Sequence, residues 1–164
     1  MSMSFEDLAM PLFPSLYGYA RWLTGEAHEA EDLVQETYLK ALRGFGSFRE
    51  GTNFRAWMFR ILRNTFLTSR SGLRSMASLD EELVEEIADI GTPETHFVNR
   101  ANGEALRRAI EGLPLPFREV LLLSDVESMS YKEISEALSI PVGTVTSRLM
   151  RARRRVRTAL EGVR

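Results

Sequence analysis

The stretch SYKEISEALSIPVGTVTSRLMRARRRVR, residues 130–157, predicts two helices joined by a tight turn. Ser130 can cap the first helix, because a serine hydroxyl can accept a hydrogen bond from a free backbone amide of the first turn. The residues of this helix expected to face inward are Ile134, Ala137 and Leu138. Residues 139–141 make the turn, and Pro141 is placed where a new helix begins.

The second helix of this pair separates apolar from polar side chains. Those expected to face inward recur at helical spacing: Val145, Leu149, Ala152 and Val156. Those expected to point outward are Thr146, Ser147, Met150, Arg151 and Arg154. This is typical of a helix-turn-helix, whose second helix presents early outward residues to base edges in the major groove. The arginines expected to meet phosphates are Arg153, Arg155 and Arg157. A helical hairpin with a solvated basic face is the alternative.

Charge is distributed in blocks along the chain, although the net charge is only −2. Acidic residues predominate up to Leu39, basic residues from Lys40 to Arg74, and acidic residues again from Asp80 to Glu94. Arginines then dominate the last helix. Because charge acts locally, two basic surfaces separated by acidic ones indicate two contacts with one polyanion.

Composition limits the class of protein. The chain has 164 residues, of which 44% are hydrophobic, and this suits one medium domain or two small ones. It has no cysteine, so a disulfide framework and a thiolate metal site are excluded. The N-terminal stretch is acidic where a signal peptide is basic, and no apolar run is long enough to span a bilayer. We therefore expect a cytoplasmic protein with no membrane insertion.

Helical periodicity dominates the chain and predicts an all-α fold. The helices expected are Leu8–Leu23, Glu29–Phe45, Phe54–Ser69, Glu94–Glu111, Pro116–Val126, Ser130–Leu138 and Val142–Leu160. A polar, acidic segment separates the third helix from the fourth. We therefore expect two small helical domains, residues 1–70 and 94–164. An acidic linker, residues 71–93, joins them and contains a short helical turn at Leu83–Ile87.

The helix that contains EAEDLVQETYLKAL, residues 29–42, has a polar face of unusual composition. Asp32, Gln35 and Glu36 share this exposed face. The residues expected to turn inward are Val34, Tyr38 and Ala41. Two carboxylates at this spacing could serve an enzyme or a metal site, but nothing supplies further ligands, and the only histidines, His28 and His96, lie in unrelated settings. An acidic and amide face is better suited to bind arginines of a protein partner.

The helix that contains NFRAWMFRILRNTF, residues 53–66, mixes aromatic residues with arginines. One interpretation is a buried helix with a solvated basic edge. The other is a surface that stacks on bases while its arginines hold phosphates. We expect Phe54, Phe59 and part of Trp57 to build the core, because large aromatics at helical spacing usually do.

Three motifs in this order resemble the extracytoplasmic-function sigma factors, the small two-domain sigma factors of bacterial RNA polymerase. The motifs are DLVQETYLKAL, GTNFRAWMFRILRNTF and LPLPFREVLLLSDVESMSYKEISEALSIPVGTVTSRLMRARRRV. The resemblance covers the chain from about Leu8 onward. It implies a sigma-2-like domain, a sigma-4-like domain and no enzymatic activity, cofactor or metal. It also implies three partners: the polymerase core, promoter DNA and an anti-sigma factor.

The resemblance assigns roles to residues of this chain. Those implied to bind the clamp coiled coil of the β′ subunit are Asp32, Gln35, Glu36 and Leu39. Those implied to handle the −10 element, where a base is flipped into a pocket, are Phe48, Arg49, Asn53, Arg60, Arg63, Asn64 and Leu67. Asn64 matches the residue that reads this base. Those implied to read the −35 element are Thr146, Ser147, Arg148, Met150, Arg151 and Arg154. The β flap is the second core contact.

One position departs from the family pattern, and three other functions stay open. Thr146 stands where several relatives carry arginine, which puts the identity of the −35 sequence in doubt. A helix-turn-helix regulator would not account for the exposed face of Asp32, Gln35 and Glu36. A sigma mimic that titrates an anti-sigma factor would tolerate loss of the base-reading residues, but Asn64 and Arg151 are present. An enzyme is disfavoured, because the sequence has no signature of a catalytic pocket such as a phosphate-binding loop or metal-ligand spacing.

Overall fold

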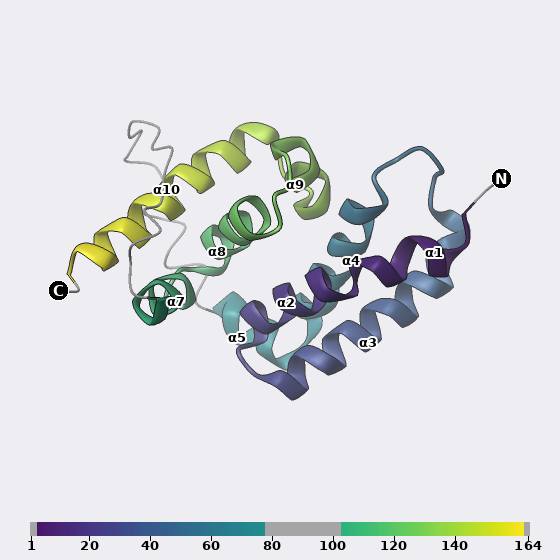
Figure 1. Cartoon of the computed structure of the whole chain (residues 1–164), viewed down its shortest axis with the longest axis horizontal. Helices are drawn as coiled ribbons and strands as arrows, with labels where there is room; N and C mark the ends of the chain where they lie inside the picture. The colour runs from purple at the N-terminus through teal and green to yellow at the C-terminus, as the bar shows by residue number, and fades with distance from the viewer. Residues whose placement is uncertain (1–2, 78–102, 163–164) are drawn as a thin grey trace. The chain divides into compact units, whose positions relative to one another are not determined.

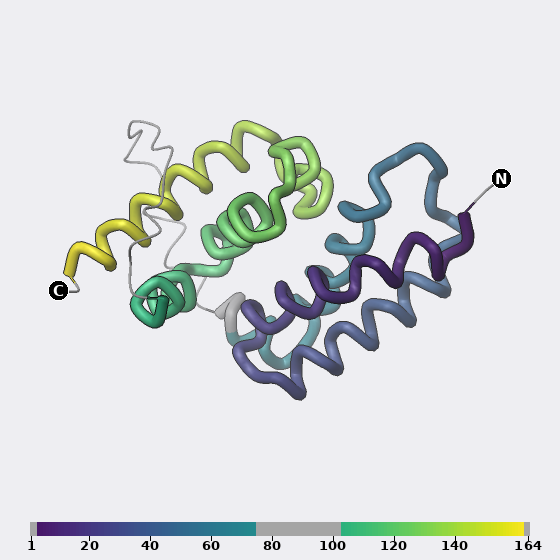
Figure 2. The backbone as a smooth tube through the Cα atoms, viewed as in Figure 1, coloured from purple at the N-terminus to yellow at the C-terminus, as the bar shows by residue number. Residues whose placement is uncertain are grey.

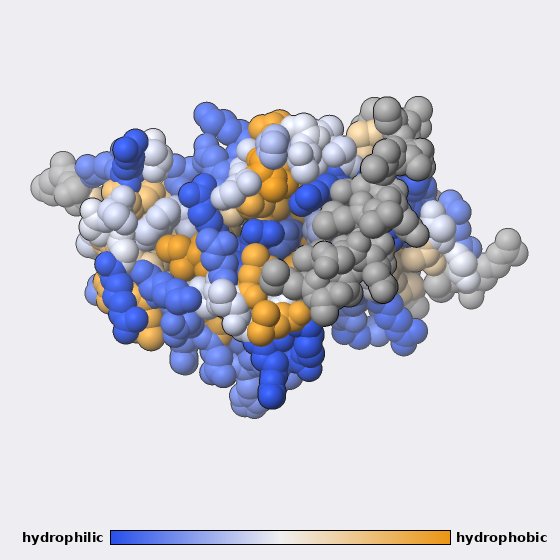
Figure 3. Space-filling view, turned by 180° about the vertical axis from the view of Figure 1, so that it is seen from behind, coloured by the Kyte–Doolittle hydropathy of each residue, from blue (hydrophilic) through white to orange (hydrophobic). Residues whose placement is uncertain are grey.

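The computed structural model describes residues 3–77 and 103–162, and every regular element in these ranges is a helix. The all-α prediction is confirmed. By their contacts the residues group into two compact units, Met1–Arg74 with Lys132–Ser139 and Ser75–Tyr131 with Ile140–Arg164. Hydrophilic residues cover much of the face drawn in Figure 3, and apolar residues show there as separate patches.

The N-terminal helix expected at Leu8–Leu23 is in fact three elements. They are α1 (Phe5–Ala9), the 3-10 turn η1 (Met10–Leu12) and α2 (Phe13–Thr24). Ser4 caps α1, because its hydroxyl accepts from the Asp7 amide at 3.1 Å. Pro11 lies in the 3-10 turn and Pro14 in the first turn of α2. Since proline has no amide hydrogen to donate, it is tolerated at a helix start and interrupts a continuous helix.

Helices α2, α3 (Ala27–Gly44) and α4 (Phe54–Thr68) pack together into a core (Figure 1). The large fully buried side chains of this core are Leu16, Tyr19, Val34, Met58, Phe59, Leu62 and Phe66. Phe59 is 1% exposed, as predicted, whereas Phe54 and Trp57 are half-buried. Asn53 caps α4, accepting from the Ala56 amide at 2.9 Å. The three helices thus hold two surfaces in one unit. One is the exposed face of Asp32, Gln35 and Glu36 on α3, here called the DLVQE face, and the other is the arginine-bearing helix α4, here called the basic helix.

Helix α3 begins with an uncommon cap, the Glu26 side chain. Its carboxylate oxygens accept from the amides of His28 at 2.9 Å and of Glu29 at 2.8 Å. These two hydrogen bonds favour the charged form and lower the pKa of Glu26 below its ordinary value of 4.5. The carboxylate therefore stabilises the folded state above the unfolded-state pKa, and this contribution is lost as the pH falls through the lower, folded value.

We expect the variant Glu26→Gln to be less sensitive to acid than the native chain. The difference in thermal midpoint between the two proteins should be largest near pH 7 and should shrink below about pH 4.5. Thermal melts followed by circular dichroism from pH 7 to pH 3 check this. A difference that stays constant across this range would show that the cap does not depend on the charge of Glu26.

A helix, α5 (Arg70–Ala77), begins directly after α4, where the sequence predicted an acidic linker from residue 71. Residues 71–77, at the start of the predicted linker, are therefore helical. Ser69 makes the corner: its hydroxyl donates to the Phe66 carbonyl at 2.6 Å and accepts from the Gly72 amide at 3.1 Å. Residues 78–93, with the turn expected at Leu83–Ile87, lie outside the described residues.

The second unit contains α7 (Gly103–Glu111), α8 (Leu115–Leu121), the π-helical turn η4 (Leu122–Val126) and α10 (Val142–Glu161). Helix α10 packs on α7 and α8. The buried apolar residues include Leu115, Phe117, Val120, Leu123, Leu149 and Val156. The helix expected at Pro116–Val126 begins at Leu115, and its second half is π-helical. The part of the helix expected before Gly103 lies outside the described residues.

Candidate nucleic-acid and protein-binding surfaces

The structure places Asp32, Gln35 and Glu36 on one exposed face of α3. The side chains expected to turn inward do so, with Val34 2% and Ala41 0% exposed and Tyr38 half-buried. On the same face Leu39 is 48% exposed. Leu42, 58% exposed, continues the surface one turn further. Leu42 is not among the residues predicted for this face, although an apolar residue three positions after Leu39 could have indicated it.

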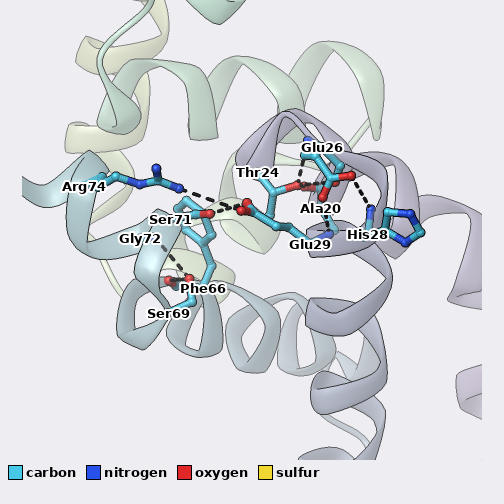
Figure 4. A network of polar contacts seen from close by, with 10 residues as sticks. All are labelled: Ala20, Thr24, Glu26, His28, Glu29, Phe66, Ser69, Ser71, Gly72 and Arg74. Carbon is cyan, nitrogen blue, oxygen red and sulfur yellow. Dashed lines mark hydrogen bonds and ion pairs between the residues drawn. The ribbon is translucent and has the colours of Figure 1, made fainter.

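A pocket of about 340 Å³ lies beside this face, between α3 and the corner of α4 and α5. Its lining includes Asp32, Leu33, Glu36, Thr65, Ser69 and Ser71. Figure 4 shows how the corner is tied to α3: Glu29 accepts a hydrogen bond from the Ser71 hydroxyl and lies 3.8 Å from the Arg74 guanidinium. The carboxylates of the DLVQE face therefore border a hollow that α5 helps to form.

The basic helix α4 brings four of the residues assigned to the −10 element onto one face. Arg60, Arg63, Asn64 and Leu67 follow the spacing i, i+3, i+4 and i+7. Asn64 is exposed, and the other three are half-buried. This face therefore combines two guanidinium groups with an exposed amide, which is chemistry suited to phosphates and base edges.

The loop before α4 is built on aromatic packing. After the 3-10 turn η2 (Phe45–Ser47), the Phe48 ring lies 5.1 Å from that of Phe54 and 5.2 Å from that of Trp57, measured between centroids. Figure 2 traces this loop from α3 to the start of α4. An open pocket of about 360 Å³ is lined there by Met3, Leu8, Phe45, Phe48, Thr52 and Phe54, among others. Asn64 does not line it, so the loop pocket and the amide are separate features.

Helix α9 (Tyr131–Leu138) meets α4 in the first unit. The Glu133 carboxylate accepts from the Arg55 guanidinium at 2.9 Å and from the Asn53 side-chain amide at 3.0 Å. The Arg60 guanidinium donates to the backbone carbonyl of Glu136 at 2.9 Å. Two residues assigned to the −10 element, Asn53 and Arg60, are thus already hydrogen-bonded, and any DNA group they bind must share or replace these partners.

The turn between α9 and α10 has the predicted form. Ser139 adopts a left-handed conformation, with φ of 57°, and Pro141 is the N-cap of α10. The predicted inward residues are buried throughout: Ile134, Ala137, Leu138, Val145, Leu149, Ala152 and Val156. On the outward side, the Thr146 hydroxyl donates to the Val142 carbonyl at 3.1 Å, and the Ser147 hydroxyl donates to the Thr144 carbonyl at 3.2 Å. Both hydroxyls therefore keep lone pairs to accept hydrogen bonds.

Three arginines of α10 lie differently from the expectation. Arg153 forms an ion pair with Asp125 at 2.7 Å, and the guanidinium of Arg155 lies 4.9 Å from the centre of the Phe117 ring. The side-chain hydrogen bond that Arg153 donates to Asp125 also raises the pKa of Arg153. Arg148, assigned to the −35 element, has a buried Nε atom, unlike a side chain presented to solvent. Arg153 and Arg155 thus already contact side chains of their own unit.

No helix among the described residues is long and apolar enough to cross a membrane. In the same part of the chain, no group of three or more histidine, aspartate or glutamate side chains could hold a metal ion.

The two halves of the chain match two family models. Residues 8–75 match Sigma-70 region 2, and residues 103–156 match Sigma-70, region 4. EcfG of Rhodopseudomonas palustris, an extracytoplasmic-function sigma factor, is 35% identical over 158 residues, which cover 96% of this chain and 85% of EcfG. The chain belongs to the extracytoplasmic-function sigma factors. SigE of Mycolicibacterium smegmatis, of the same family, is 35% identical over 159 residues, and the match spans 96% of this chain and 62% of SigE.

A solved structure resembles this sigma factor along almost its whole length. It is the sigma factor RpoE of Bartonella quintana in complex with the anti-sigma factor NepR. The two chains are 30% identical, the TM-score is 0.70, and the match covers 97% of this chain and 99% of RpoE. The sigma factor thus consists of a region 2 part that carries the DLVQE face and the basic helix, and a region 4 part that carries the helix-turn-helix.

Proposed function

We propose that this sigma factor joins core RNA polymerase and directs it to promoters through a −10 and a −35 element. The observation that carries the proposal is the placement, in one compact unit, of the exposed face of Asp32, Gln35 and Glu36 beside the basic helix α4. An acidic and amide surface suits a basic protein partner, and a basic surface suits DNA. The protein itself catalyses no reaction and acts in the cytoplasm, where the polymerase works.

The DLVQE face is proposed to dock on the clamp coiled coil of the β′ subunit. Asp32 and Glu36 can accept charge-assisted hydrogen bonds from arginines, and Gln35 can both donate and accept. Leu39 and Leu42 add exposed apolar surface at one end of the face. This combination of a polar centre and an apolar end resembles the composition of stable protein interfaces. The region 4 part is proposed to contact the β flap.

The surface of Arg60, Arg63, Asn64 and Leu67 is proposed to bind the opened −10 element. Removing a base from the stack costs a few kcal/mol, which a fitted site and phosphate contacts can offset. The exposed Asn64 amide can both donate to and accept from the edge of an extruded base. The loop that carries Phe48 and Arg49 supplies an aromatic ring for stacking and a guanidinium for phosphate.

The early outward residues of α10 are proposed to read the −35 element in the major groove. Because the hydroxyl protons of Thr146 and Ser147 are bonded within the helix, both hydroxyls can accept from base amino groups. Thr146 can also place its methyl group against that of thymine. Arg151 and Arg154 are the guanidinium groups proposed to reach guanine edges or phosphates. When core polymerase holds both DNA-binding parts, binding at one element favours binding at the other. We therefore expect the isolated sigma factor to bind promoter DNA weakly.

Arg153 of α10 should contribute measurably to stability. Arg153→Ala breaks the half-buried ion pair with Asp125 and should lower the free energy of unfolding by about 1–2 kcal/mol. Thr158→Ala, at an exposed position of the same helix, should leave stability almost unchanged. Urea unfolding measures both variants. Equal losses of stability in the two variants would contradict the assignment.

An anti-sigma factor is proposed to control this protein. The support is the likeness to RpoE of Bartonella quintana, which was solved with the anti-sigma factor NepR and matches nearly the whole chain. An inhibitor that covers the DLVQE face or the basic helix would block polymerase or DNA. Such an inhibitor would need a surface complementary to the face that it covers.

Transcription of whole genomic DNA tests the proposal without a promoter chosen in advance. Purified bacterial core polymerase is incubated with fragmented genomic DNA of the source bacterium, with and without the sigma factor, and the RNA 5′ ends are sequenced. We expect new start sites that share two sequence elements at a fixed spacing upstream. If the protein adds no start sites and does not bind the core, a helix-turn-helix regulator or a sigma mimic is the better account.

A further inference from the structure

Helix α1 is fixed at both of its ends. At its start, the Phe5 ring meets Phe45 and Phe54 edge-on, with centroids 5.3 Å and 6.3 Å away. At its end, the Tyr38 hydroxyl donates to the carbonyl of Ala9 at 2.7 Å, and Ala9 is fully buried. A helix of one and a half turns has little stability of its own, so these contacts hold α1 in place.

The contacts of Phe5 continue into the loop before α4. The Phe45 ring is stacked on Phe48 with 6.2 Å between centroids, and Phe48 in turn packs on Phe54 and Trp57. Along the chain, Arg49 follows Phe48 directly and is exposed. Phe5 is thus two ring contacts away from the residues proposed to stack on bases and to bind phosphate.

The other hydrogen bonds of the loop are local, apart from the one that Asn53, at its end, donates to Glu133. Its backbone hydrogen bonds join Phe48 to the Phe45 carbonyl and Thr52 to the Arg49 carbonyl. Gly51 has a φ of 89°, a backbone conformation that residues with a side chain rarely adopt. The open pocket of about 360 Å³ separates part of the loop from Met3 and Leu8 of the N-terminal segment. Aromatic packing, to which α1 contributes Phe5, is therefore a main restraint on the loop.

We propose that α1 positions the loop of residues 45–53 for the opened promoter strand, and that Phe5 is the positioning residue. Phe5 itself contacts no DNA in this account. It holds Phe45, and through Phe45 also Phe48, in the conformation that binds DNA. The loop is therefore ordered before DNA binds. The DNA part of this inference rests on the proposed function, whereas the restraint on the loop does not.

Limited proteolysis of the intact free protein tests the restraint. Trypsin cleavage after Arg49 requires the loop to open locally. Phe5→Ala should raise the rate of this cleavage about tenfold, and Phe5→Tyr, which keeps the ring, should restore the native rate. Tyr17→Ala is the matched control, because the Tyr17 ring stacks on Phe13 and meets neither Tyr38 nor the loop rings. Cleavage after Arg21, on α2 of the same unit, should not change. An unchanged rate at Arg49, or an equal rise at Arg21, would overturn the proposal.

The functional role is tested by permanganate reactivity of promoter thymines near the −10 element with reconstituted holoenzyme. Phe5→Ala should reduce strand opening about tenfold while its affinity for core polymerase stays native, and Phe5→Tyr should restore opening. Native opening by Phe5→Ala would overturn the positioning role. If even the native chain opens no promoter, the proposed function fails, and with it the DNA role, while the cleavage rates still decide separately whether α1 restrains the loop.

Discussion

Replacing Gly72 by alanine should lower the free energy of unfolding by about 2 kcal/mol, because overpacking of a tight contact costs about 1–3 kcal/mol. A Cβ atom at this position would lie 2.6 Å from the carbonyl carbon of Phe66 and 2.7 Å from the Cα of Leu67, and closer still to the Phe66 oxygen. These are backbone atoms, which cannot move aside as a flexible side chain can. The corner between α4 and α5 must therefore open, which disturbs the cap made by Ser69.

A second glycine provides the matched control for this experiment. Gly18 lies in the interior of α2, where its backbone is helical and an added Cβ atom would meet no neighbouring atom within 4 Å. Gly18→Ala should therefore stabilise the protein by up to about 1 kcal/mol. Urea unfolding of both variants measures the difference. If Gly72→Ala is as stable as Gly18→Ala, the close approach of α5 to α4 is not as described.

The double variant Asp32→Ala and Gln35→Ala should bind core polymerase at least 30-fold more weakly than the native chain. A loss of this size corresponds to about 2 kcal/mol, which is typical of residues at the centre of an interface. Both side chains are exposed on α3, so their loss should leave the fold intact. The affinity is measured by titrating core polymerase into the fluorescently labelled sigma factor.

The control variant is Glu6→Ala. Glu6 is exposed in the first turn of α1, so it belongs to the same unit but lies outside the DLVQE face. It changes the net charge by the same amount as Asp32→Ala. We expect Glu6→Ala to bind core polymerase almost normally. Equal weakening in both variants would point to net charge rather than to the DLVQE face.

Helical periodicity predicted the parts of the fold that depend on local pattern. All seven apolar positions assigned to the interior of the helix-turn-helix are buried, because an amphipathic helix can place its apolar stripe only against the core. The exposed face of Asp32, Gln35 and Glu36 was predicted for the same reason. The N-cap of Asn53 and the position of Pro141 follow from the chemistry of these residues alone.

Other features depend on contacts between residues far apart in the sequence. Arg153 and Arg155 lie beside the buried apolar stripe of α10. Only the folded structure shows that Arg153 contacts Asp125 and that Arg155 contacts Phe117. The sequence of α5 is polar, which is typical of a linker, yet Gly72 of this helix fits against the end of α4. The packing of Phe5 on Phe45 brings together elements forty residues apart, which no local pattern indicates.

Run-off transcription tests the central claim most directly. One promoter found with genomic DNA is transcribed by bacterial core polymerase alone, with the native sigma factor, and with the Asp32→Ala and Gln35→Ala variant. We predict a transcript from one start site that requires the native sigma factor and falls at least tenfold with the variant when the sigma factor is limiting. No start-site-specific transcript with the native protein, or an equal yield with the variant, would contradict a sigma factor that docks through the DLVQE face.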